Sequence, residues 1–190
     1  MTRNSERTRR ALLDAATATI RARGTRVTLA AVADAAGVTK GGLLHHFPNR
    51  DALFTAVARD SLDQLHVRVS ALVDLSENYP GKLLRAYIRA LFDQELDMFG
   101  QSDYPGLWGA LCVVPGVAEI LAEDNELWQR SFAEDGLHPD RISVAQYAAE
   151  GVAATVQWQQ KTDAALEHAQ AAIIAITTVN GPIDGGRGDS

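Results

Sequence analysis

The chain has 190 residues, of which 46% are hydrophobic, and its 18 basic and 24 acidic residues give a formal net charge of −6. This length suffices for one domain or two small ones. The single cysteine excludes a disulfide within the chain and any CxxC metal or redox pair. The polar start MTRNSERTRR does not resemble a signal peptide, and no run of eighteen apolar residues is present. We therefore expect a cytoplasmic protein with no membrane partner.

Charge is distributed unevenly along the chain. Residues 1–60 contain 10 Lys and Arg against 5 Asp and Glu, whereas residues 61–190 contain 8 against 19. Seven arginines lie on the arm into the first predicted helix and at its far end: Arg3, Arg7, Arg9, Arg10, Arg21, Arg23 and Arg26. A basic head on an acidic body steers a polyanion to one face of a molecule.

The segment 28–53, TLAAVADAAGVTKGGLLHHFPNRDAL, predicts two short helices that meet at Gly37. Thr28 and Thr39 have the side chains that cap helix N-termini, and Asn49 is the expected cap of the longer helix that follows. Gly37 stands where the chain must leave the first helix through a left-handed turn, which costs glycine little. This order of signals predicts a helix-turn-helix and therefore DNA binding, although a helix corner joined by glycine is also common in all-helical proteins.

The second short helix contains Gly41 and Gly42, and each glycine costs about 1 kcal/mol relative to alanine inside a helix. A helix that brings its backbone against bases and phosphates in a major groove supplies a reason for them. Donors suited to phosphates and base edges surround these glycines: Thr39, Lys40, His45, His46 and Arg50. His45 and His46 are not expected to share a metal, because adjacent side chains on a helix diverge by about 100°.

Beyond residue 48 the apolar residues recur at helical spacing, and no alternating strand pattern appears. Helices are predicted over about 49–76, from Leu84 to Met98, and over about 139–160 and 163–179. Breaks are predicted at residues 79–81, 100–106, 115–116, 136–139 and 161–162. The chain is thus expected to be all-α with about nine helices and a disordered tail over 181–190.

Aromatic residues are concentrated in the middle of the chain, and an apolar cavity with a few polar groups is the usual form of a small-molecule site. The candidate ligand-binding residues are His66, Phe92, Glu95, Trp108, Cys112, Trp128 and Tyr147. For each aromatic side chain core packing is the alternative interpretation. His66 is expected in the core or lining the pocket, and Cys112 is expected to be a buried thiol.

An apolar stripe runs along the last predicted helix through Ala169, Ala172, Ile173, Ile176 and Val179. It fits either the core within one chain or contact with a second copy. Geometry favours a homodimer, because two recognition helices about 34 to 36 Å apart can read one palindrome.

Residues 8–65 resemble the DNA-binding domain of the TetR (tetracycline-repressor-like) family of bacterial transcription regulators. The resemblance is carried by ALLDAATATIRARG in the first helix, by the run VTLAAVADAAGVTKGGLLHHFPNRDAL and by the long helix after it. It implies an all-α homodimer with a helix-turn-helix domain over residues 1–48. It further implies an effector-binding and dimerisation domain over residues 49–180.

By the same resemblance, Thr28 and Thr39 place hydroxyls on phosphates, and Lys40 and Gly41 approach bases or backbone. His45, His46 and Arg50 are then further phosphate contacts. Leu44 departs from the family pattern, since many members have a DNA-contacting tyrosine there, and a leucine offers only apolar contact.

The function expected from these observations is a repressor that binds a palindromic operator as a dimer and is released by a small-molecule effector. A non-sequence-specific DNA-binding protein would share the basic head, and a purely structural dimer is a third alternative. An α-helical enzyme is a further alternative, but the sequence has no GxSxG, SxxK or HExxH motif and no glycine-rich phosphate loop after a strand. No catalytic residue, metal site or cofactor is predicted.

Overall fold

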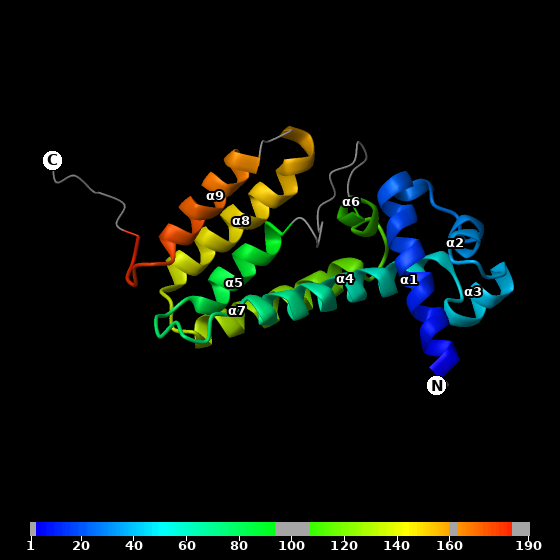
Figure 1. Cartoon of the computed structure of the whole chain (residues 1–190), viewed down its shortest axis with the longest axis horizontal. Helices are drawn as coiled ribbons and strands as arrows, with labels where there is room; N and C mark the ends of the chain where they lie inside the picture. The colour runs from blue at the N-terminus through cyan, green and yellow to red at the C-terminus, as the bar shows by residue number, and fades with distance from the viewer. Residues whose placement is uncertain (1–2, 94–106, 160–162, 184–190) are drawn as a thin grey trace. The chain divides into compact units, whose positions relative to one another are not determined.

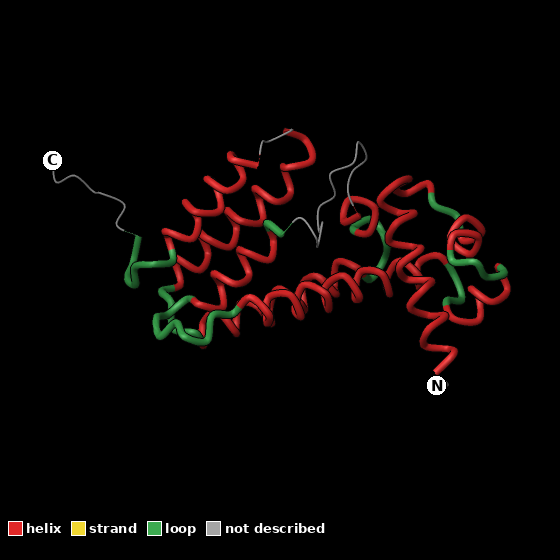
Figure 2. Tube along the Cα trace, in the orientation of Figure 1, coloured by secondary structure: helices red, strands yellow, loops and turns green. Residues whose placement is uncertain are grey.

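The computed structural model describes residues 3–93, 107–159 and 163–183 (Figure 1). All regular structure in these ranges is helical, which confirms the all-α prediction (Figure 2). The helices are α1 (Arg3–Arg23), a 3-10 turn η1 (Gly24–Arg26), α2 (Leu29–Ala35), α3 (Lys40–His46), α4 (Arg50–Leu72), α5 (Lys82–Leu91), α6 (Leu107–Leu111), α7 (Val117–Glu134), α8 (Pro139–Gln159) and α9 (Asp163–Ile176). Among them, none has the length and apolar character needed to cross a membrane.

The described residues form two compact units, one from residues 1–64 and 97–123 and the other from residues 65–96 and 124–190. By this division α4 and α7 each contribute residues to both units. The boundary predicted between residues 48 and 49 stays a prediction.

In the first unit, α1 packs against α2 and α6, and α2 packs against α3. One face of α1 is fully buried because its apolar residues recur every three or four positions. Buried apolar side chains of α1, α2, α3 and α4 in this unit include Leu12, Leu13, Ala16, Ile20, Val32, Leu43, Leu53 and Phe54. The short helices α2 and α3 are therefore fixed by tertiary packing, since helices of seven residues are marginal alone.

In the second unit, α5 packs against both α8 and α9, which also pack against each other (Figure 1). Helix α5 is enclosed almost all round, and seven of its ten residues are buried: Leu84, Arg85, Ala86, Tyr87, Ile88, Ala90 and Leu91. Helix α9 is much less buried than α5, since Ile173 is its single buried residue. Apolar burial within this chain therefore holds α5 firmly and α9 only lightly.

Some helix ends differ from the sequence prediction. Helix α4 ends at Leu72 rather than near residue 76, because the Asp74 carboxylate accepts hydrogen bonds from the Ser76 amide at 2.9 Å and hydroxyl at 2.6 Å. Such a local turn competes with helix continuation. Helix α5 ends at Leu91, and the predicted extension to Met98 falls outside the described residues.

The left-handed turn at Gly81 generates a prediction about stability. Gly81 has φ +91°, and a Cβ there would lie 2.8 Å from Arg85 Nη1, whereas a Cβ at Gly136 (φ +80°) would meet open space. Gly136→Ala should therefore cost about 1 kcal/mol of unfolding free energy through strain alone, and Gly81→Ala about 2 to 3 kcal/mol through strain plus overlap. Urea unfolding of both variants measures this, and equal losses would contradict the close packing of Arg85 under Gly81.

Candidate nucleic-acid interface

Two threonine caps begin the short helices of the first unit. Thr28 Oγ1 accepts a hydrogen bond from the Ala31 amide at 3.2 Å, and Thr39 Oγ1 accepts one from the Gly42 amide at 3.0 Å. Both caps were predicted from the sequence and are confirmed. Each hydroxyl accepts with its oxygen, so its own proton remains available for an acceptor such as a phosphate oxygen.

The turn between α2 and α3 is made by Gly37, which has φ +67°. Its amide donates to the Asp34 carbonyl at 3.1 Å, and the Val38 amide donates to the Ala33 carbonyl at 2.9 Å. These bonds close the end of α2 in the way that a left-handed glycine permits. The chain then re-enters a helix at Thr39, as the sequence predicted.

Helix α3 has one buried side and one open side. Leu43 is fully buried, and Phe47 just after the helix is 3% exposed. The open side and its flanks hold the predicted DNA-contacting residues: Thr28, Thr39, Lys40, Gly41, Leu44 and His45 are exposed, and His46 and Arg50 are half-buried. All eight residues are thus accessible on one short stretch of the first unit, and their contact with DNA stays a prediction.

Arg50 has a structural role that the sequence did not reveal. Its guanidinium donates to the Thr25 carbonyl at 2.8 Å and to the Val27 carbonyl at 3.4 Å. It also lies 4.0 Å from the centroid of the Phe54 ring, within cation–π range. Arg50 therefore ties the first turn of α4 to the segment that precedes α2.

Arg10 belongs to the basic head, but its charge is compensated. Its guanidinium forms ion pairs with Asp14 and Asp60, each at 2.5 Å. The hydrogen bonds to these two carboxylates raise the pKa of Arg10 above its ordinary value. The field that this head presents to a polyanion is accordingly weaker than a count of its arginines suggests.

Two of the predicted ligand-binding residues meet in the second unit. The His66 and Trp128 rings stack with centroids 4.2 Å apart, and His66 Nε2 lies 2.6 Å from Asp124 Oδ1. Trp128 also contacts the Tyr87 and Phe132 rings, at 5.0 Å and 5.5 Å between centroids. Phe92 is half-buried just after α5. We call His66, Tyr87, Trp128 and Phe132 the aromatic cluster. Of these four residues, His66 and Trp128 were predicted from the sequence as ligand-binding residues.

The other candidates are not brought into this cluster. Trp108 is 8% exposed and, like Cys112, falls in the first unit. The prediction of a buried Cys112 thiol was wrong: Cys112 is exposed, because it follows the buried Leu111 at the end of α6 and turns outward. Glu95 lies outside the described residues.

Tyr147, another ligand-binding candidate, lies on the outer side of its helix. It is 63% exposed on α8, whose buried face carries Ala145, Gln146 and Ala149. A tyrosine two residues after a core alanine points away from that face in a helix with 3.6 residues per turn. Contact of Tyr147 with an effector stays a prediction.

A buried polar network beside the aromatic cluster was also missed. Tyr87 donates its hydroxyl proton to Glu150 Oε1 at 2.9 Å, and Gln146 Nε2 donates to the same oxygen at 2.8 Å. Burial, followed by the neighbouring Glu150 charge, raises the pKa of Tyr87 well above its ordinary value. Among the described residues, the buried indole N–H of Trp128 has no hydrogen-bond partner. The Gln146 and Glu150 spacing of four on one helix was the available sequence signal.

The capped helix pair around Gly37 defines a helix-turn-helix protein. Comparison with family models agrees: the model for bacterial regulatory proteins of the tetR family matches residues 12–57, and that for the tetracyclin repressor-like C-terminal domain matches residues 81–178. The chain belongs to the TetR family of bacterial regulatory proteins, as its resemblance implied.

One curated relative is the HTH-type transcriptional repressor KstR2 of Mycobacterium tuberculosis, 35% identical over 83 residues. That alignment spans 43% of this chain and 41% of the relative. Among solved structures, a transcriptional regulator from Rhodococcus sp. Rha1 has a TM-score of 0.69 at 22% identity, covering 91% of this chain and 95% of that one. The multidrug binding protein EbrR complexed with imidazole has a TM-score of 0.66 at 21% identity, covering 97% and 96%. These structures establish likeness of fold.

The contacts of Arg50 generate a second stability prediction. Arg50→Met keeps apolar contact with Phe54 but removes the hydrogen bonds to Thr25 and Val27, so the unfolding free energy should fall by about 1 to 2 kcal/mol. Lys40→Met, which alters an exposed cation on α3, is the matched control and should change it by less than about 0.5 kcal/mol. Urea denaturation compares the two, and indistinguishable midpoints would show that Arg50 does not tie α4 to the preceding segment.

Proposed function

We propose that this protein is a ligand-responsive transcriptional repressor that binds a palindromic operator as a homodimer and releases it when a small-molecule effector binds. The observation that carries the proposal is the open side of α3, which presents Lys40 and Gly41 beside a capped, glycine-closed turn. Such a helix fits the major groove with its N-terminal residues against base edges. KstR2, the curated relative, is itself named a transcriptional repressor.

Gly41 supports a close approach to DNA. It lies within α3, and a Cβ at this position would have only ordinary contact, 3.9 Å from Thr39 Oγ1. Nothing in the fold therefore requires glycine, although alanine would favour the helix by about 1 kcal/mol. A ligand that must reach the backbone itself accounts for the missing side chain.

Exposed apolar side chains on and beside the last two helices support a homodimer. Val144 and Tyr147 on α8 are 45% and 63% exposed, and Val179 beyond α9 is 55% exposed. Large apolar side chains left exposed at this end of the chain favour contact with another protein surface. A second copy of the chain also supplies the second recognition helix that a palindrome requires.

The aromatic cluster supports an effector site in the second unit. It combines stacked rings with carboxylates of Asp124 and Glu150, and it encloses the unpartnered N–H of Trp128. A buried donor without a partner costs about 1 to 3 kcal/mol, which a ligand or water acceptor would offset. EbrR, a solved structure of similar fold, was determined with imidazole and with ethidium. His66, Phe92 and Trp128 are accordingly the residues we propose for effector contact.

The function is tested by selecting bound sequences from a random DNA pool with the full chain at a stated salt concentration. A palindrome with half-sites about one helical turn apart should be enriched, and a scrambled duplex should compete at least about 1,000-fold more weakly. Equal competition would instead favour the non-sequence-specific alternative, and no binding at all would favour a structural dimer or an enzyme.

Gly41→Ala should separate folding from DNA binding. The unfolding midpoint should rise slightly, because alanine favours the helix, while affinity for the selected palindrome should fall by about tenfold or more as the methyl group holds α3 away. Gly42→Ala is the matched control: Gly42 is half-buried and its Cβ would lie against Thr39 and Val38, so DNA affinity should fall less. Affinities come from fluorescence anisotropy, and unchanged binding by Gly41→Ala would contradict the proposed approach.

A further inference from the structure

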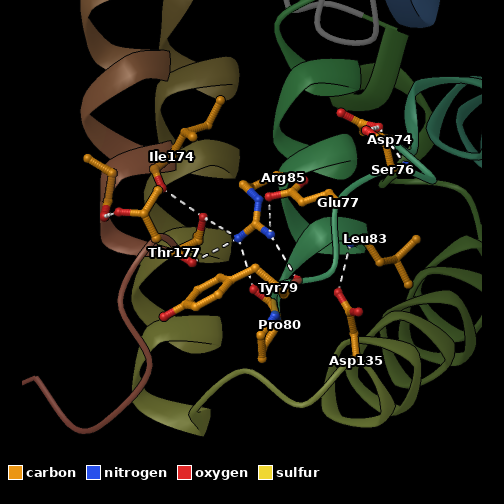
Figure 3. Close-up of polar contacts among 12 residues, drawn as sticks. Asp74, Ser76, Glu77, Tyr79, Pro80, Leu83, Arg85, Asp135, Ile174 and Thr177 are labelled. Atoms are coloured by element: carbon orange, nitrogen blue, oxygen red, sulfur yellow. Dashed lines mark hydrogen bonds and ion pairs between the residues drawn. The ribbon is translucent and has the colours of Figure 1, made fainter.

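Arg85, in the second unit, is a buried arginine whose guanidinium is paired with a carboxylate. The Arg85 side chain is 2% exposed and pairs with Glu77, with Nη2 2.6 Å from Oε1 (Figure 3). Its guanidinium also donates to the Pro80 carbonyl at 3.0 Å and to the Tyr79 carbonyl at 3.2 Å. All these partners lie in the loop of residues 73–81, which joins α4 to α5.

The same guanidinium reaches the end of α9. Arg85 Nη1 donates to the Thr177 carbonyl at 2.8 Å and lies 3.3 Å from Thr177 Oγ1, across 92 residues of sequence. Thr177 is fully buried, and its hydroxyl donates back to the Ile174 carbonyl at 2.7 Å. One planar group thus joins the α4–α5 loop to the C-terminal turn of α9, as Figure 3 shows.

The backbone at Gly81 leaves room for the Arg85 guanidinium. Gly81 adopts φ +91°, and any Cβ there would overlap Arg85 Nη1. Among the described residues, Arg85 Nε is buried with no partner. A buried ion pair is weak evidence for stability, because an apolar side chain of similar volume often serves folding as well. What an apolar side chain cannot supply is the directional link between the loop and α9.

Helix α9 needs such a link because apolar contact places it only lightly. Ile173 is its one buried residue. The hydroxyls of Thr177 and Thr178 donate to the Ile174 and Ala175 carbonyls near its end, and arginines from other helices bond the Ile176 carbonyl and the residues that follow it. Besides the Arg85 bond to Thr177, Arg141 of α8 donates to the Ile176 carbonyl at 2.8 Å and to the Gly181 carbonyl at 2.7 Å. Directional bonds from Arg85 and Arg141 therefore join the C-terminal end of α9 to α5 and α8, in addition to the packing of these helices.

We infer that Arg85 is a positioning residue for assembly: by joining the α4–α5 loop to the end of α9, it sets the surface through which two chains associate. This inference rests on the proposed homodimer. A displacement of the loop at the end of α4 would then reach α9 through Arg85, which gives α4 a direct mechanical connection to the association surface.

The test compares Arg85→Lys and Glu77→Gln with two controls in the full chain. Lysine keeps the charge but loses the planar fork, and glutamine leaves the Arg85 charge uncompensated. Ile20→Val, in the core of the first unit, destabilises the fold without touching the Arg85 contacts, and Arg130→Met alters an exposed arginine on α7. Sedimentation velocity gives the dimer dissociation constant, and thermal unfolding gives the midpoint.

Both test variants should weaken dimerisation by about tenfold or more. Ile20→Val should lower the unfolding midpoint with little change in dimerisation, and Arg130→Met should change neither. Glu77 is 27% exposed, so Glu77→Gln is expected to fold. If Arg85→Lys does not fold, the dimerisation of Glu77→Gln tests the inference by itself. Lower midpoints with unchanged dimerisation would overturn the inference and leave Arg85 a folding residue. A wild-type chain that stays monomeric at all concentrations would instead overturn the proposed homodimer.

Discussion

The left-handed turn at Gly37 is the constraint on which the rest of the proposed DNA-binding surface depends. With φ +67° and the Val38 amide bonded to the Ala33 carbonyl, the chain reverses in a few residues. Leu43 is then fully buried, with α3 packed against α2. Because that side of α3 is buried, the opposite side must face outward, and it carries Lys40 and Gly41. A different turn would rotate α3 and lose this arrangement.

Several arginines of this chain connect distant segments. Arg10 joins α1 to Asp60 of α4, Arg50 joins α4 to the carbonyl of Thr25, and Arg85 joins the α4–α5 loop to α9. A planar guanidinium with five donors can bond several carbonyls or carboxylates at once. The short helices and the lightly buried α9 are placed by such contacts together with apolar packing. Positive charge in the sequence is therefore a poor measure of positive charge free to meet DNA.

The sequence predicted the features whose causes are local. The caps at Thr28 and Thr39, the turn at Gly37 and the all-α fold follow from side chains acting on backbone within a few residues. Exposure of Cys112 and Tyr147 was not predictable in this way, because it depends on which helix packs against which face. The roles of Arg50 and Arg85 were missed for the same reason, since their partners lie 25 and 92 residues away. The end of α4 differed from the prediction because the local turn at Asp74 competed with helical periodicity.

The central claim is that the segment from Thr28 to Arg50 reads DNA through the open side of α3. Hydrogen–deuterium exchange of the full chain, with and without a duplex carrying the enriched palindrome, tests it most directly. The account predicts that slowed exchange on DNA binding is greatest in residues 28–50, with α3 amides protected most. Protection confined to other parts of the chain, with α3 exchanging at its free rate while DNA is bound, would contradict it.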